Sequence, residues 1–390
     1  MDALPLRVLH VAETAQGGVG SYIEDIVALQ VARYGETAVR AVLPREHAVH
    51  FKRLPTASLR LFDIAASGRT ASMVKMAVLA LAEIHRWRPE VVHLHSTYAG
   101  FVLRPVLMLM PSRPRIVYCA HGWAFDREGS ARSNRWLARI ERLWSLACDA
   151  VVCISQHDAA SARRVGIAPS RLVTVSNGIA AASAPPAAAV ALAAQRWRGD
   201  GLRVLFVGRL DRQKGADVLY EALRRLGPRA SAVVVGAAVV AGDGAAPPDN
   251  VQVTGWLPRD EIAALYAASQ VLVVPSRWEG FGLVAVEAMR AGRAVLASRV
   301  GGLPEVVDAG VTGALFEPGD TVGLADLLAC LSAAELAAMG EAGRARFEHL
   351  FDVTRVVDEL DALYQRLLAS KAPADLSARS IGATGPTPLG

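Results

Sequence analysis

The sequence contains little cysteine and no long apolar segment. Its 390 residues include four cysteines, none in a Cys-x-x-Cys pair, so we expect reduced thiols and neither a disulfide framework nor a zinc site. No window reaches the ~18 consecutive apolar residues of a membrane-spanning helix, and Met1–Pro5 lacks the basic stretch of a secretory signal. We therefore expect a cytoplasmic protein that is neither secreted nor transmembrane. The cysteines are Cys119, Cys148, Cys153 and Cys330.

Lysine is also scarce, and the charge is divided unevenly along the chain. Only four of the 42 basic residues are lysines. Residues 1–180 hold 22 basic and 14 acidic residues (+8), whereas residues 181–390 hold 20 and 23 (−3). A basic first half favours an anionic partner there, either a phosphorylated acceptor or a membrane surface; an arginine-rich composition without such a partner is the alternative. We expect no nucleic acid partner, and the sequence leaves the oligomeric state open.

Short apolar runs alternate with longer segments of helical periodicity along the whole chain. This pattern predicts an α/β fold with two Rossmann-like doubly wound domains that face an interdomain cleft. We expect a first domain at 1–182, a linker rich in Ala and Pro at 183–200, and a second domain at 201–345. A C-terminal helix at 346–370 would pack back on the first domain, ahead of a disordered tail at 371–390. The expected strands are Arg7–Ala12, Val39–Leu43, Val91–Leu94, Ile116–Cys119, Ala150–Ile154, Leu172–Val175, Arg203–Val207, Ala232–Val235, Val251–Val253, Val271–Val274, Ala294–Ala297 and Gly313–Phe316.

A glycine-rich turn follows the first expected strand. Gly17, Gly18 and Gly20 precede a helix expected from Ile23, and the free backbone amides of such a turn suit a phosphate. A dinucleotide-binding fingerprint would need glycine in place of Ile23 and an acidic residue at the end of the second strand, so NAD is disfavoured. A purely structural tight turn is the alternative.

Two loops of the second domain carry charged residues directly after strands. In the first loop, Arg209 and Lys214 would hold two phosphates of a diphosphate; a solvated basic loop is the alternative. In the second, Glu279 projects from the loop and Gly282 opens a helix whose free amides can bind phosphate. Glu287, inside that helix, would accept hydrogen bonds from ribose hydroxyls. The strand-loop-helix context makes this pair more specific than either glutamate alone.

These motifs together resemble glycosyltransferase family 4, whose members have the GT-B fold. The resemblance spans residues 7 to about 350 and is more specific in the second half. It implies a retaining enzyme that moves a hexose from a UDP- or GDP-linked sugar to a lipid-linked or oligosaccharide acceptor in cell-surface or exopolysaccharide biosynthesis. The matching motifs are Gly17-Gly18, His121-Gly122, Ser176-Asn177-Gly178, Gly208-Arg209-Leu210 with Lys214-Gly215, Glu279 with Glu287, and Gly301-Gly302-Leu303-Pro304-Glu305.

The resemblance also implies a role for each matching residue. Arg209 and Lys214 would contact the diphosphate, and Glu279 would contact the sugar hydroxyls. His121, which follows an expected strand, would reach the sugar from the first domain and complete the catalytic set, while Glu287 would bind the ribose. The other implied substrate-binding residues are Gly17 and Gly18, near the donor phosphate or the acceptor, and Gly280, Phe281, Gly282 and Leu283.

The chemistry of the leaving group fits these assignments. Bond cleavage builds negative charge on the diphosphate, which positive side chains and helix-start amides stabilise. The sequence has no Asp-x-Asp pair to hold a divalent metal, so we expect neither a metal nor another cofactor. Because the two glutamates have other roles, front-face return is favoured over a covalent glycosyl-enzyme. The alternatives are a sugar-nucleotide 2-epimerase or a phosphorylase of the same fold, and a non-catalytic sugar-nucleotide-binding protein.

Two further histidines alternate along an expected strand. His93 and His95 either bind a metal, for which no third ligand is evident, or pack and hydrogen-bond at the strand end. The packing interpretation is favoured, because a metal site needs at least three protein ligands.

A basic segment in the first domain bears on the membrane. Four arginines recur at helical spacing beside apolar residues, which indicates either a basic amphipathic helix at an anionic interface or a core-facing helix with a solvated basic side. Peripheral association with the inner face of the cytoplasmic membrane would bring the enzyme to a polyprenyl-diphosphate-linked or glycan acceptor. The arginines are Arg132, Arg135, Arg139 and Arg142, and the apolar residues are Trp136, Ile140, Leu143 and Trp144.

Overall fold

The computed structural model describes residues 6–66, 68–238 and 246–370, except for the side chains of residues 49 and 50. The tail expected at 371–390 therefore lies outside the described residues. The chain divides into two compact units, each built on its own parallel sheet. The first unit comprises the residues up to Ser176 together with those from Val356, and the second runs from Asn177 to Arg355.

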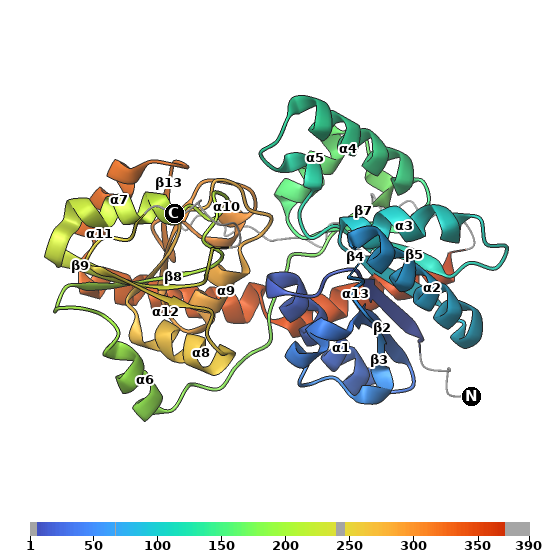
Figure 1. Ribbon diagram of the computed structural model, residues 1–390, viewed down its shortest axis with the longest axis horizontal. Coiled ribbons are helices and arrows are strands. Elements are labelled where there is room, and N and C mark those ends of the chain that lie inside the picture. Colours follow the sequence, from blue (N-terminus) through green and yellow to red (C-terminus); the bar gives the residue numbers. More distant parts are fainter. Residues whose placement is uncertain (1–5, 67, 239–245, 371–390) are drawn as a thin grey trace, which may run out of the picture. The chain divides into compact units, whose positions relative to one another are not determined.

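The first unit is a doubly wound sheet of seven parallel strands in the order β3-β2-β1-β4-β5-β6-β7. Apolar side chains of these strands are buried on both faces because helices cover both faces (Figure 1). The strands are β1 (Val8–Ala12), β2 (Val39–Pro44), β3 (Leu59–Phe62), β4 (Val91–His95), β5 (Arg115–Cys119), β6 (Ala150–Cys153) and β7 (Leu172–Thr174). The helices are α1 (Gly17–Tyr34), α2 (Arg69–Trp87), α3 (Thr97–Met108), α4 (Ala131–Ser145) and α5 (Gln156–Arg164).

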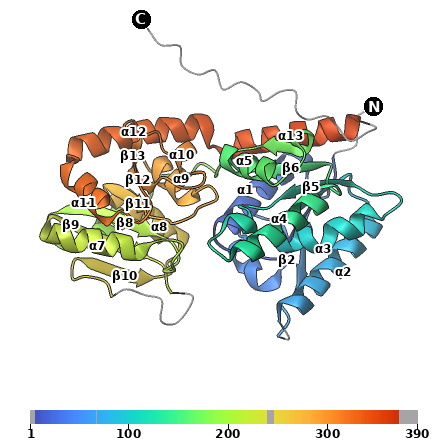
Figure 2. The same cartoon turned by 90° about the horizontal axis from the view of Figure 1, so that it is seen from above.

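The last helix of the chain, α13 (Val353–Ala369), completes the first unit. From Val356 onward the helix belongs to that unit, and Figure 2 shows it lying alongside the other elements of the unit. Its Tyr364 hydroxyl lies 2.7 Å from His93 Nδ1 in β4, and its Asp361 accepts a hydrogen bond from Arg33 in α1. The helix thus covers a buried polar cluster as well as apolar core.

The second unit repeats this architecture with six parallel strands in the order β10-β9-β8-β11-β12-β13. Its apolar core lies between the sheet and helices that include α7 and α11. The strands are β8 (Leu202–Val207), β9 (Ala230–Val235), β10 (Val251–Gly255), β11 (Val271–Val274), β12 (Ala294–Ser298) and β13 (Gly313–Phe316). The helices are α6 (Ala187–Ala194), α7 (Ala216–Leu226), α8 (Arg259–Ala268), α9 (Leu283–Arg290), α10 (Leu303–Val306), α11 (Thr321–Cys330) and α12 (Ala333–Leu350).

All twelve expected strands are present, and the structure adds β3, an edge strand that pairs only with β2. Its sequence, Leu-Arg-Leu-Phe, is interrupted by an arginine, and most of the strand is only half buried. It therefore lacks the continuous apolar run that marks the other strands. Helix α1 begins at Gly17 and not at Ile23 as expected, so the glycines form its first turn. The helix expected over 346–370 is two helices, α12 and α13, separated at Phe351 and Asp352.

Two segments of chain connect the units, and they are hydrogen-bonded to each other. The Ile179 amide donates to the Phe351 carbonyl at 2.9 Å, and the Val353 amide donates to the Ile179 carbonyl at 3.0 Å. The segment predicted as a linker, 183–200, lies within the second unit and contains α6, which packs on α8. The chain passes between units beside Ser176 and Val356, outside the segment expected as a linker.

Within the described ranges, no single helix has the length and apolar character of a membrane span. Helices α11 and α12 satisfy both criteria only as a pair, bent by 102° where they meet. Their Leu324, Leu328 and Leu336 are core residues of the second unit, as expected for helices of a globular fold.

Candidate functional site

The charged loops of the second unit lie where a doubly wound sheet binds its ligands. Strands β8 and β11 are adjacent at its centre, and the chain leaves them for opposite sides of the sheet. Ligands of such sheets bind beyond the carboxyl ends of the strands at this switch point. The loop from Gly208 to Gly215 follows β8, and the loop from Pro275 to Gly282 follows β11.

The two loops meet through an ion pair between the residues expected to bind the diphosphate and the sugar. Lys214 Nζ lies 2.5 Å from Glu279 Oε2, and the Ser276 hydroxyl donates to the same oxygen at 3.2 Å. Both charged side chains are largely buried, with 20% and 11% of their surfaces exposed. Each charge is therefore balanced within the loops, which holds both side chains in place for a ligand.

Arg209 is placed differently from Lys214. Its guanidinium is about half exposed, and Nη2 lies 3.0 Å from Asp211 Oδ2 and 2.7 Å from Gln213 Oε1, both in its own loop. An exposed cation with two weakly held contacts can turn to an incoming phosphate at small cost.

Further hydrogen bonds fix the two loops against each other. The Arg277 amide donates to the Gln213 carbonyl at 2.8 Å, and the Gln213 side chain donates to the Trp278 carbonyl at 3.1 Å. The Arg277 guanidinium binds Asp217 at the start of α7 through both nitrogens, at 2.9 and 2.5 Å, which lowers the pKa of that carboxyl. The loops are thus preorganised without a ligand.

Glycines allow the close approach of backbone that this arrangement needs. Gly282 caps α9 with φ +92°, a left-handed conformation, and as a glycine it offers no side chain to cap that helix. A Cβ on Gly301 (φ +56°) would lie 1.7 Å from the Glu279 carbonyl oxygen. The Phe281 side chain is buried and packs edge-on against Phe351. Leu283, the first residue of α9, is partly buried, and Gly280 accepts a hydrogen bond from the Gly302 amide at 3.2 Å.

Glu287 lies in the second turn of α9 and is held by a tyrosine. The Tyr266 hydroxyl donates to its Oε2 at 2.9 Å. Burial raises the pKa of Glu287, an effect that Arg290 and the Tyr266 hydrogen bond oppose. This hydrogen bond engages only one of the two carboxylate oxygens.

The expected residues of the first unit also gather at the carboxyl ends of its strands. Gly17 and Gly18 are exposed in the first turn of α1, after β1, and the side chain of the N-cap residue Gln16 makes no capping hydrogen bond. His121 follows β5, is partly exposed, and has φ +56°, a conformation that is uncommon for a residue other than glycine. Strained backbone of this kind is found preferentially at functional sites.

His121 ends a row of hydrogen-bonded imidazoles. Its Nε2 lies 2.9 Å from His95 Nδ1, and His95 Nε2 lies 2.9 Å from His10 Nδ1. Burial lowers the pKa of His121 to about 3 and that of His10 to about 4, so the rings are neutral at pH 7. Tyr22 in α1 packs edge-on against His121, with ring centroids 4.8 Å apart.

The same cluster is where the structure brings together nitrogens that a metal ion could share. His10, His93 and His95 are fully buried, and one ring nitrogen of each lies within 4.8 Å of the others. The nitrogens of His10 and His95 already have hydrogen-bond partners, and only His93 Nε2 lacks one within the described residues. His10 is thus a third candidate ligand that spacing along the sequence did not indicate, and hydrogen bonds engage both ring nitrogens of His10 and of His95.

Several residues that shape these sites were missed at the sequence level. Ser276 and Gln213 have a detectable signal, because they lie in the charged loops themselves. No sequence signal marks the other three, Tyr266, Gln30 and Asp361. Each is distant in the sequence from the residue it supports, and each lies in an ordinary helical pattern.

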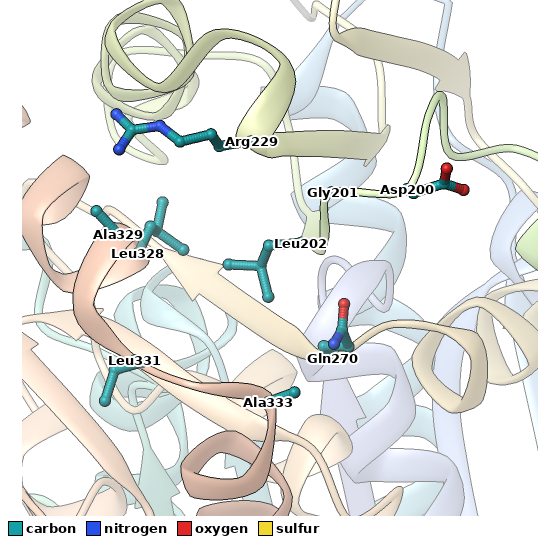
Figure 3. Close-up of a pocket in the computed structure, with 9 residues that line it drawn as sticks. All are labelled: Asp200, Gly201, Leu202, Arg229, Gln270, Leu328, Ala329, Leu331 and Ala333. Carbon is teal, nitrogen blue, oxygen red and sulfur yellow. The ribbon is translucent and has the colours of Figure 1, made fainter.

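A hollow of about 250 Å³ lies at the opposite edge of the second sheet, where β8 and β11 begin (Figure 3). Gln270, one of its lining residues, accepts a hydrogen bond from the Arg203 amide at 2.9 Å. The hollow is thus remote from the charged loops and carries none of the expected site residues. It is lined by Asp200, Gly201, Leu202, Arg229, Gln270, Leu328, Ala329, Leu331 and Ala333.

Helix α4 exposes basic and apolar side chains together. All four of its expected arginines are exposed, and none has an ion pair with another described residue. Trp136 and Leu143 on the same helix are 58% and 54% exposed, and Leu146, directly after it, is 56% exposed. Trp144 is partly buried against Phe101 of α3.

Both halves of the chain match known protein families. Residues 16–183 match the family model described as Glycosyltransferase Family 4, and residues 191–346 match the one described as Glycosyl transferases group 1. A Klebsiella pneumoniae protein described as an uncharacterized 41.2 kDa protein in the cps region is 28% identical over 325 residues, covering 81% of this chain and 88% of that protein. D-inositol 3-phosphate glycosyltransferase of Mycolicibacterium vanbaalenii is 35% identical over 251 residues, covering 57% of this chain and 54% of that enzyme.

Solved structures share the fold at low sequence identity. Sucrose-phosphate synthase from Thermosynechococcus elongatus superimposes with a TM-score of 0.79 at 23% identity, over 93% of this chain and 99% of that one. Anabaena Alr3699/HepE in complex with UDP-glucose gives a TM-score of 0.76 at 20% identity, over 93% and 100%. Both are two-sheet α/β proteins of the GT-B kind, as this chain is.

Proposed function

Because the chain belongs to glycosyltransferase family 4, we propose that it transfers a hexose, with retention of anomeric configuration, from a nucleoside-diphosphate sugar. The acceptor would be a lipid-linked or oligosaccharide chain in cell-surface or exopolysaccharide biosynthesis. The observation that carries the donor half of this proposal is the buried Lys214–Glu279 pair at the switch point of the second sheet. It provides one cation for a phosphate and one carboxylate for hydroxyls, a few ångströms apart.

The surrounding groups suit the parts of a nucleotide sugar. Arg209 and the start of α9 would hold the diphosphate oxygens, and Glu287 would accept from a ribose hydroxyl. UDP is the favoured nucleotide over GDP, because structural neighbours such as HepE bind UDP or UDP-glucose. The cps-region relative supports a role in polysaccharide assembly.

The reaction would proceed without a metal or other cofactor. Lys214, Arg209 and the α9 amides would stabilise charge on the leaving diphosphate, the role that a divalent ion takes elsewhere. Glu279 is held by Lys214 and Ser276, which suits it to hydroxyl binding better than to attack on the sugar. Front-face return, with the leaving phosphate accepting the acceptor's proton, would therefore give retention.

The first test measures donor binding and turnover. We expect UDP, and not GDP, to raise the melting temperature, and transfer to be unchanged in EDTA and to give the retained anomer by proton NMR. Turnover of donor alone to an epimer would identify a 2-epimerase, and binding without any turnover would identify a non-catalytic protein. If no nucleoside diphosphate raised the melting temperature, the assignment of the donor site would be wrong.

Variants of the ion pair separate function from folding. Lys214→Met should lower kcat/KM about 100-fold or more, because a transition-state cation is lost, and should also destabilise by stranding Glu279. Adding Glu279→Gln should restore stability and leave activity low. Lys75→Met, at an exposed lysine of α2, is the matched control and should leave both unchanged. Restored activity in the double variant would show that Lys214 acts only through folding.

Peripheral membrane binding through α4 is the remaining part of the proposal. An anionic phospholipid surface fits the unpaired arginines of this helix, while Trp136, Leu143 and Leu146 would enter the interface. Each arginine near such a surface contributes about 1 kcal/mol, so Arg135→Gln with Arg139→Gln should weaken vesicle binding about 30-fold.

Flotation with vesicles tests this surface. We expect binding to phosphatidylglycerol vesicles at low salt and none to neutral phosphatidylcholine vesicles. Arg224→Gln with Arg225→Gln on α7 makes the same change in charge and should bind normally. If both double variants lost vesicle binding equally, only net charge would matter. If the wild-type protein did not bind at low salt, α4 would not be a membrane-binding surface.

A further inference from the structure

We infer that Asp361 and Gln30 set the tautomer of His121 through His95 and His10, so that His121 presents Nδ1 as a hydrogen-bond acceptor to a hydroxyl of the ligand. The inference deepens the proposed function and rests on it for the identity of that ligand. Asp361, Gln30, His10 and His95 act through His121 and are positioning residues.

The row begins at a carboxylate. Asp361 accepts from Arg33 Nη1 at 3.0 Å, and from Gln30 Nε2 at 3.4 Å. A carboxylate accepts only, so the Gln30 amide must turn its NH₂ group toward Asp361. That orientation leaves the Gln30 carbonyl oxygen facing His10, whose Nε2 lies 2.8 Å away.

Each ring then fixes the next. The Gln30 carbonyl only accepts, so His10 Nε2 must carry a proton and donate it, and a neutral His10 leaves Nδ1 bare. His95 Nε2, 2.9 Å from that nitrogen, must therefore donate, which leaves His95 Nδ1 bare in turn. By the same step His121 Nε2 donates to His95 Nδ1, and the His121 Nδ1 lone pair remains.

Burial supports the requirement that every ring be neutral. His10 and His95 are fully buried, and burial lowers the pKa of each of the three rings well below 7. A cationic imidazole carries protons on both nitrogens. Two neighbouring cationic rings would therefore face each other with donors and no acceptor. Among the described residues, the hydrogen bond of the His121 ring is the one between Nε2 and His95 Nδ1, and the residue as a whole is partly exposed.

The tautomer decides which ligand group His121 can bind. A bare Nδ1 accepts from a hydroxyl but can neither donate to a phosphate oxygen nor offer it positive charge. His121 would therefore select a hydroxyl of the ligand and not a phosphate oxygen. This selection follows from the hydrogen bonds of the first unit alone.

The test reads the tautomers directly in the full-length protein labelled with ¹⁵N-histidine. Long-range ¹H–¹⁵N correlation spectra distinguish Nε2–H from Nδ1–H for each ring. In the wild-type protein we expect Nε2–H at His10, His95 and His121. Nδ1–H at His121 in the wild-type protein would overturn the inference. So would one equivalent of metal bound to the wild-type protein and absent from the His10→Ala variant.

Two variants at the start of the row should change its end. Gln30→Leu removes the acceptor and should leave His121 as a mixture of tautomers. Gln30→Lys replaces the acceptor by a donor that Asp361 can pair, and should reverse all three rings to Nδ1–H. Tyr364→Phe removes a hydroxyl that pairs with His93, outside the row, so the signals of His10, His95 and His121 should match the wild type. Unchanged His121 tautomers in both Gln30 variants would contradict the inference.

Kinetics connect the row to the ligand. Gln30→Lys should raise the donor KM on the order of 10-fold, the cost of one hydrogen bond that reverses its direction, and Gln30→Leu should raise it less. A changed tautomer with an unchanged KM would overturn the ligand contact. A wild-type protein without transferase activity would instead refute the proposed function, and the spectra would still decide whether the row exists.

Discussion

At the scale of single residues, the histidine row shows how burial and hydrogen bonding select a protonation state. His10, His93 and His95 have no exposed surface, and desolvation is the main cause of their lowered pKa values. The neutral rings satisfy one another as donor and acceptor, which a charged ring would disrupt. The same residues that orient His121 therefore link the stability of the first unit to pH.

The stability of the first unit should fall as the pH falls from about 6.5 to about 4. In the unfolded chain His10 gains its proton near pH 6.5, whereas in the folded chain it does so near pH 4. Between these values the unfolded state binds more protons, so acid favours unfolding, by up to about 1.4 kcal/mol per histidine and pH unit. Urea unfolding at pH 7, 6 and 5 measures the slope.

A matched pair of variants assigns that slope. His10→Gln should flatten the pH dependence, and His349→Gln, at an exposed histidine of α12, should not. Equal slopes in wild type and His10→Gln would show that the row is protonated as easily in the folded state as in the unfolded one.

At the scale of elements, a buried ion pair fixes α4 and decides which of its faces meets solvent. Arg104 of α3 donates to Glu141 of α4 at 2.7 Å, and both residues are almost fully buried. The Tyr118 hydroxyl of β5 donates to the other Glu141 oxygen at 3.0 Å, and its ring lies 3.9 Å from the Arg104 guanidinium carbon. Because Glu141 points inward, the arginines of α4 point outward.

Glu141→Ala should destabilise the first unit by about 3–5 kcal/mol, because it strands a buried guanidinium. Arg104→Met with Glu141→Leu removes both charges and should recover most of the loss. Urea unfolding followed by the fluorescence of the buried Trp123 measures both variants. A cost below about 1 kcal/mol for Glu141→Ala would mean that water reaches Arg104.

The elements also show what the sequence could predict. The twelve expected strands were found because each is a short apolar run followed by a polar or glycine-rich loop, which is how a strand buried on both faces appears. The charged loops were found for the same reason, since the site residues follow the strands directly. Phe281 was expected near the substrate, but sequence spacing alone could not show that its side chain packs on Phe351, 70 positions away.

The supporting contacts could not be predicted, because they join residues that are distant in the sequence. Asp361 is 331 residues from Gln30, and Tyr266 is 21 residues from Glu287. Each looks like an ordinary helical position until the fold brings the partners together. Local periodicity thus predicted where the site residues lie, and tertiary structure determined what each can do.

At the scale of the whole molecule, the chain consists of two cores joined by two segments. Leu9, Met76 and Leu103 belong to the core of the first unit, and Val204 and Leu223 to that of the second. The first unit needs α13, so it can be complete only when residues from Val356 onward have joined it. Each core is large enough to unfold cooperatively by itself.

Unfolding should therefore occur in two transitions, one for each unit. UDP should raise the free energy of unfolding of the second unit only. The proposed nucleotide contacts, Lys214, Glu287 and the start of α9, all belong to that unit. At a concentration of 100 Kd the stabilisation should be about 2.7 kcal/mol. Native-state hydrogen exchange measures it element by element, with amides of β8 and β11 reporting on the second unit and those of β1 and β4 on the first.

Two variants make this measurement decisive. Lys214→Met should abolish the protection that UDP gives to β8 and β11, and Lys75→Met should preserve it. If UDP protected β1 and β4 as strongly as β8 and β11, the nucleotide would draw on both units, and the assignment of the diphosphate to the second unit alone would be wrong.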